Sequence, residues 1–93
     1  MDSSLARRIL RRHLERYRSF SYQDLRRRIG SVETQEVRGA NGVLYQLEIQ
    51  FFWDGEPNGN VRVIGSIDDG GLRAFVPLSD DFILSPSGRF VGE

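Results

Sequence analysis

Residues 43–53 read VLYQLEIQFFW, with apolar side chains at every second position from Val43 to Trp53. The polar residues Gln46, Glu48 and Gln50 take alternate positions. This period of two is typical of a β-strand with one apolar face. The sequence therefore predicts a long strand that lies across a hydrophobic core.

Turn signals on both sides of this strand predict an antiparallel meander. They are Asn41-Gly42, Asn58-Gly59 and Asp68-Asp69-Gly70-Gly71. The turns divide the region into four strands, expected at 32–38, 43–53, 61–67 and 72–77. A short hairpin between 82–84 and 89–91 is expected to follow.

The register of these strands follows from keeping one face apolar, because a slip by one residue would reverse both faces. Trp53 is expected opposite Val61, and Leu47 opposite Ile67. On the next strand, Ile67 is expected opposite Leu72. A helix with an apolar stripe of matching size can then cover this face.

Residues 4–18 supply such a helix. Their apolar side chains gather on one half of a helical wheel, and most of their arginines lie on the other half. Ser3 or Ser4 is the expected N-cap. A second, short helix is expected at 22–29, where Ser21 and Asp24 form a capping box and Gly30 ends the helix.

The chain of 93 residues is expected to form one α+β domain, 1–93, with both helices on one face of an antiparallel meander of four or more strands. It has no cysteine, no stretch resembling a signal peptide and no apolar run long enough to span a membrane. These features favour a cytoplasmic protein without a membrane partner.

The net charge of zero conceals a strong asymmetry, since all 13 basic residues are arginine. Residues 1–30 hold nine arginines and three acids, whereas 31–93 hold four arginines and ten acids. One interpretation of this asymmetry is that the Arg-rich helix binds nucleic acid. The pI of about 6.6 and the lack of a recognition helix after a short turn argue against it.

Candidate catalytic and metal-binding residues are few, so the sequence predicts neither an enzyme nor a cofactor. His13 is the one histidine, and we expect it at the core edge with its ring bonded to a backbone or tyrosine oxygen. Asp54–Gly59 resembles a calcium loop at its first positions but lacks the twelfth-position acid. The acidic pairs Asp68-Asp69 and Asp80-Asp81 are attributed to turns and capping.

The sheet face turned away from the first helix is expected to carry an apolar band with a charged rim. Such a patch usually marks an interaction surface, so the predicted partner is a second copy of the chain, in a homodimer, or another protein. The alternative is that the tail, residues 78–93, covers this face. The predicted interface residues are Glu48, Phe52, Arg62, Ile64, Arg73 and Phe75.

One motif is similar to a known family. Gln35-Glu36-Val37-Arg38-Gly39 resembles the Q-x-V-x-G hairpin of cystatins and, like it, follows a helix and a strand and precedes a long strand. The resemblance covers about residues 32–50. It implies a helix-on-meander fold and a hairpin, carried by Gln35, Val37 and Gly39, that inhibits papain-like proteases. The family's N-terminal glycine segment and its Pro-Trp hairpin are missing.

The sequence thus favours a small, non-catalytic binding or assembly domain. A cystatin-like inhibitor and nucleic-acid binding through the arginine-rich helix are the alternatives.

Overall fold

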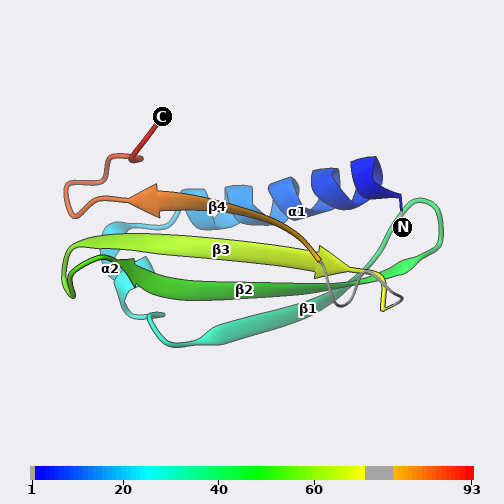
Figure 1. Ribbon diagram of the computed structural model, residues 1–93, viewed down its shortest axis with the longest axis horizontal. Helices are drawn as coiled ribbons and strands as arrows, with labels where there is room; N and C mark the ends of the chain where they lie inside the picture. Colours follow the sequence, from blue (N-terminus) through cyan, green and yellow to red (C-terminus); the bar gives the residue numbers. More distant parts are fainter. Residues whose placement is uncertain (1, 71–76) are drawn as a thin grey trace.

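The fold is a four-stranded antiparallel sheet with two helices on one face, which confirms the predicted α+β class. The computed structural model describes residues 2–70 and 77–93. The sheet has the simple order β1-β2-β3-β4 (Figure 1). In chain order the elements are α1 (Ser3–Arg18), α2 (Tyr22–Arg26), β1 (Val32–Arg38), β2 (Leu44–Asp54), β3 (Asn60–Asp68) and β4 (Leu78–Leu84).

The central hairpin has the predicted register. Trp53 pairs with Val61, and Leu47 pairs with Ile67. The alternation of β2 and β3 turns most of their apolar side chains towards the helices, where they are buried, and leaves the intervening residues, Phe52 and Ile64 among them, on the opposite face. The buried core residues are Ala6, Leu10, Leu14, Leu25, Tyr45, Leu47, Ile49, Phe51, Val61, Val63, Ile67, Phe82 and Leu84.

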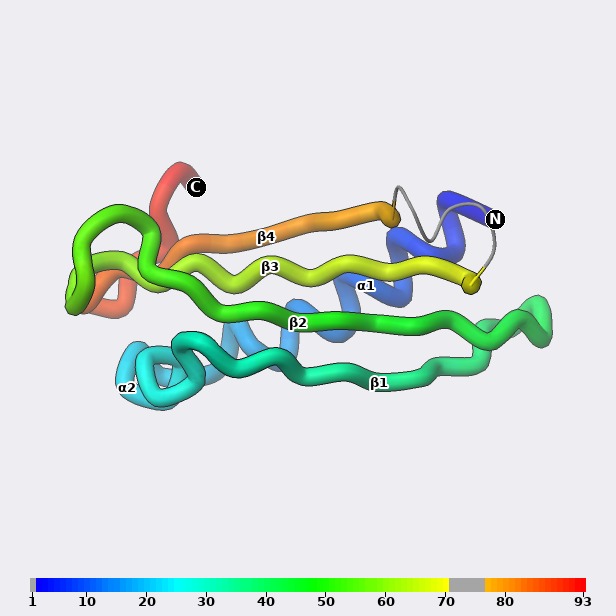
Figure 2. The backbone as a smooth tube through the Cα atoms, turned by 60° about the horizontal axis from the view of Figure 1, so that its bottom comes forward, coloured from blue at the N-terminus to red at the C-terminus, as the bar shows by residue number. Residues whose placement is uncertain are grey.

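Helix α1 packs on β3 and β4 and lies along the strands behind the sheet (Figure 2). Its approach is close because Gly65, in the middle of β3, has no side chain. A β carbon at Gly65 would lie 2.8 Å from Leu10 Cδ1 and 3.1 Å from Leu14 Cδ2. The N-cap is Asp2, whose Oδ1 accepts from Leu5 N–H at 3.0 Å, so the expectation of Ser3 or Ser4 was wrong by one residue or two.

Helix α2 is shorter than predicted and ends at Arg26 instead of residue 29. The predicted Ser21 cap is confirmed, since its Oγ accepts from Asp24 N–H at 3.1 Å. Gly30 has the positive φ of 83° that a glycine terminating such a segment adopts.

The strand that pairs with the second edge of β3 differs from the predicted one. Residues 72–77 were expected beside β3, but β4 occupies that edge, with Ile67 opposite Leu78 and Val63 opposite Phe82. Residues 71–76 lie outside the described part of the chain, and Pro77 is in no strand. Two charge contacts support β4: Asp81 pairs with Arg62 at 2.6 Å, and Asp80 lies 3.7 Å from Arg11 of α1.

The tail forms the predicted hairpin and returns on the helix side. Ser85 N–H donates to Arg89 O, and Val91 N–H donates to Ile83 O. The Arg18 guanidinium lies 4.0 Å from the centroid of the Phe90 ring and pairs with Glu93. That pairing raises the pKa of Arg18 and lowers the pKa of Glu93. The alternative in which residues 78–93 cover the other sheet face is therefore wrong.

Candidate functional site

A groove lies between α1 and the edge strand β1. Since α1 lies over β3 and β4, the helix-facing side of β1 stays partly uncovered. The cavity there has a volume of about 430 Å³, within the range of ligand-binding clefts. We call it the α1–β1 groove; its lining residues are Leu5, Arg8, Ile9, Arg12, His13, Val37, Arg38 and Ala40.

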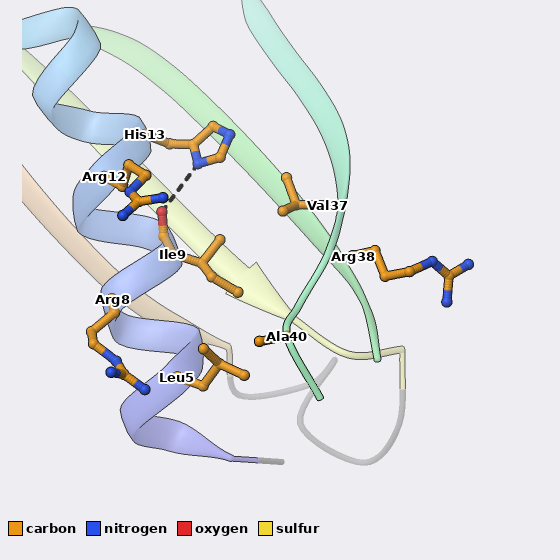
Figure 3. A pocket seen from close by; sticks show the side chains of 8 residues that line it. All are labelled: Leu5, Arg8, Ile9, Arg12, His13, Val37, Arg38 and Ala40. Carbon is orange, nitrogen blue, oxygen red and sulfur yellow. Dashed lines mark hydrogen bonds between the residues drawn. The ribbon is translucent and has the colours of Figure 1, made fainter. Parts of the chain in front are cut away.

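Helical spacing explains the apolar wall of this groove. Leu5 and Ile9 are four residues apart, so they lie one turn above each other on the flank of α1 that faces β1. Val37 points towards them from the strand (Figure 3). These three side chains are partly buried and pack against the core. The groove thus offers an apolar wall continuous with the hydrophobic core.

His13 lies at the inner end of the groove, on the same flank as Leu5 and Ile9. Its Nδ1 lies 3.0 Å from Ile9 O (Figure 3), which confirms the prediction of a half-buried imidazole bonded to a backbone oxygen. His13 also lines a second cavity of about 70 Å³, together with Tyr17 and Glu33. The two cavities share His13 as a lining residue.

A polar cluster that includes Tyr17 and Glu33 borders the second cavity. Tyr17 Oη donates to Glu33 Oε1 at 2.7 Å, and Arg28 Nε lies 3.2 Å from Glu33 Oε2. Burial, reinforced by the hydrogen bond to Glu33, raises the pKa of Tyr17 to about 12. The phenol therefore stays neutral at physiological pH and acts as a structural donor that ties α1 to β1.

Arginines form the solvent-facing rim. Arg8 and Arg12 line the cavity, and among the described residues no carboxylate lies within ion-pair distance of either. The opposite flank of α1 differs, because Arg11 lies 3.7 Å from Asp80 and Arg18 pairs with Glu93. Arg38 lines the groove at its base, but its guanidinium points away (Figure 3) and donates to Gly42 O.

The outer edge of β1 runs beside this groove. Gly39 N–H donates to Val43 O at 2.8 Å, so these residues form a hydrogen-bonded pair that continues the β1–β2 register. Such pairs recur at every second residue. The backbone groups of Thr34 and Glu36 therefore point away from β2. Since β1 is a terminal strand of the sheet, they lie at its open edge.

The outer sheet face carries only part of the interface that the sequence predicted. Phe52 is 43% exposed there. Ile64 is half buried and lies between Gln50 and Asp81. The predicted register, with Ile67 opposite Leu72, would have placed Phe75 opposite Ile64, and that pairing was wrong. Phe75 and Arg73 themselves fall outside the described residues.

Two charged residues of the predicted interface are engaged within the sheet. Arg62 donates to Asp54 and to Asp81, at 2.9 Å and 2.6 Å, and these carboxylates raise its pKa. Glu48 accepts from the Gln50 amide at 2.9 Å. Arg62 and its partner Asp81 therefore lie beside the apolar residues Phe52 and Ile64.

The residues of the cystatin-like motif lie in β1 and at the start of the turn that follows. Val37 faces the groove (Figure 3), while Gln35 is exposed. Gly39 is required by packing, since a β carbon there would lie 2.8 Å from Tyr45 Cε2 and 3.3 Å from Leu5 Cδ2. Packing therefore explains the glycine at position 39. Inhibition of papain-like proteases remains a prediction.

The acidic pairs have separate roles. Asp68 accepts from Gly70 N–H at 2.8 Å, which is the expected turn chemistry. Asp80 and Asp81 belong to β4, so their assignment to a turn or cap was wrong. Within residues 2–70 and 77–93, no three potential metal-ligating side chains gather into a site. Neither described helix has the length and apolarity needed to cross a membrane.

Sequence reasoning did not identify the α1–β1 groove. Leu5, Ile9 and His13 were expected on the buried stripe of α1, and only their position beside a partly uncovered edge strand makes them a surface. No protein-family model, curated protein or solved structure matches the chain, so proposals about its function rest on this geometry.

Proposed function

We propose that this chain is a non-catalytic binding domain that takes up an extended protein segment as an additional strand beside β1. The observation that supports it is the open backbone edge of Thr34 and Glu36 next to the α1–β1 groove. Strand addition uses backbone hydrogen bonds for affinity and places alternate side chains in pockets for specificity. We place the domain in the cytoplasm, in keeping with its cysteine-free composition.

The pleat of a strand sets where the side chains of the added segment lie. Residues of a strand alternate between the two faces of a sheet. Every second side chain of the segment would therefore stand on the helix side, next to Leu5, Ile9 and Val37. The other side chains would extend the outer sheet face.

Thr34→Pro is expected to weaken ligand binding strongly and to leave the fold intact. Thr34 is exposed on an edge strand, where proline is tolerated. Proline removes the N–H that the added strand needs and keeps the bonds from β1 to β2. Peptides selected from a random library on the wild-type chain should lose at least about tenfold in affinity.

The matched control is Thr34→Val, which retains the backbone N–H and should bind like the wild type. Calorimetry gives the affinities, and circular dichroism checks folding. In the wild-type complex, amide exchange at Thr34 and Glu36 should slow. Equal binding by Thr34→Pro, or a failure to select any peptide that binds in solution, would contradict strand addition.

Self-association through the outer sheet face is a second candidate, favoured by the exposure of Phe52 and Val32, which are 43% and 53% exposed. In this arrangement Phe52 and Ile64 of two copies pack together, with Glu48 and Arg62 at the rim. A symmetric dimer would remove these apolar side chains from water.

Phe52→Glu is accordingly expected to weaken self-association. Analytical ultracentrifugation of the wild type over a micromolar concentration series should detect a dimer, and the variant should shift towards monomer at the same concentrations. Gln50→Glu adds the same charge on this face and should have a smaller effect, because anchors at the centre of a patch dominate. A wild-type chain that is monomeric throughout would rule out the dimer.

A further inference from the structure

We infer that the segment bound at β1 is acidic as well as apolar, with carboxylates that pair with Arg8 and Arg12 at the rim of the α1–β1 groove. This inference rests on the proposed function and specifies its ligand. The two flanks of α1 differ in whether their arginines are paired with acids.

On the β4 flank, the chain supplies its own acids. Arg11 lies 3.7 Å from Asp80, and Arg18 pairs with Glu93. On the β1 flank, Arg8 and Arg12 line a cavity, and within the described residues neither has a carboxylate partner. The two arginines are also four residues apart, so their charges repel each other along the helix. An acidic ligand on this flank would remove that repulsion.

The opposite side of the molecule is less favourable for an acidic ligand. The outer sheet face carries Glu36, Glu48 and Asp81, while Arg62 is already paired there with Asp54 and Asp81. The helix layer carries the arginines of α1, whereas acids outnumber Arg38 and the paired Arg62 on the far sheet face. Charge complementarity therefore directs an acidic segment to the helix side of β1.

The spacing of the two arginines matches that of an extended ligand. Residues four apart on a helix are separated by about 6 Å along its axis, at roughly 1.5 Å per residue. Residues two apart on a strand are separated by about 6.6 Å and point to the same side. Since α1 lies along the strands (Figure 1), the pattern acid-any-acid fits Arg8 and Arg12. An aliphatic residue on the same side of the segment would pack against Leu5 and Ile9.

The test is a parallel selection from one random peptide library on three proteins: the wild type, the groove variant Arg8→Glu/Arg12→Glu and a matched control. The matched control is Arg7→Glu/Arg16→Glu, which changes the net charge equally on α1 but alters no residue of the groove. Wild type and control should both select peptides with acids at alternate positions. The groove variant should lose this preference and select lysine or arginine instead.

The test is completed by measuring the affinities of two peptides. One is a selected acidic peptide, and the other is the same peptide with both acids changed to glutamine. Wild type should bind the acidic form about tenfold more tightly, with the difference shrinking at high salt. The groove variant should not discriminate. If the selected peptides bind without acid enrichment, this inference is wrong and strand addition stands; if no peptide binds, both are wrong.

Nucleic acid is the competing ligand for the same arginines. Labelled single-stranded DNA and RNA are therefore titrated against the same three proteins. Submicromolar binding that falls steeply with salt and is lost in Arg8→Glu/Arg12→Glu would assign the rim to phosphate groups and overturn the inference. We expect weak binding that does not depend on these two positions.

Discussion

Replacing Gly65 with leucine is expected to destabilise the fold by about 2 to 3 kcal/mol, the upper part of the range of roughly 1 to 3 kcal/mol for overpacking a core. A β carbon at this position would already lie 2.8 Å from Leu10 Cδ1 and 3.1 Å from Ile49 Cδ1. The larger side chain can enter only if α1 moves away from β3. Urea unfolding followed by circular dichroism measures the loss.

Ser66→Leu is the control for this variant. Ser66 is the next residue of β3, half exposed, with Glu48 and Ser79 as its cross-strand neighbours on the outer face. The same substitution there should change the free energy of unfolding by less than about 0.5 kcal/mol. Equal effects at the two positions would show that α1 does not pack closely over Gly65.

Leu10→Ala is expected to cost about 3 kcal/mol, because Leu10 is fully buried between α1 and the sheet. Domains of this size have a total stability of roughly 5 to 15 kcal/mol, so either variant removes a large share. The control on the same helix is Arg16→Ala, which changes an exposed side chain and should be nearly neutral.

The two substitutions should partly compensate each other. Alanine at position 10 leaves space directly over position 65, and the leucine of Gly65→Leu can fill it. The double variant should therefore be more stable than the sum of the single effects predicts, by about 1 kcal/mol or more. Strict additivity would mean that Leu10 and Gly65 do not share this volume.

Local patterns predicted most of the fold. The helices and the hairpin of β2 and β3 follow from periodicity and turn residues, which act between neighbours in the chain. Local patterns could not predict which segment forms the fourth strand of the sheet. Residues 72–77 alternate like a strand, whereas β4 contains Asp80 and Asp81, which are unfavourable in strands. Their acceptance in β4 depends on Arg11 and Arg62, which come from other elements.

The candidate groove was missed for a related reason. The sequence places Leu5 and Ile9 on the apolar stripe of α1, but it does not say over which strands the stripe will lie. A helix centred on β2 would have buried both side chains. The observed position over β3 and β4 depends on the close approach at Gly65, which no periodic pattern reveals.

Because α1 packs on strands that come later in the chain, its apolar stripe has no partner when it is first synthesised. Helix α1 leaves the ribosome before β3 and β4, and these packing partners begin at Asn60 and end at Leu84. At typical rates of translation, its apolar stripe stays without a partner for on the order of several seconds. During this interval the arginines on its other side keep the nascent helix strongly charged, which opposes its aggregation until β3 and β4 have emerged.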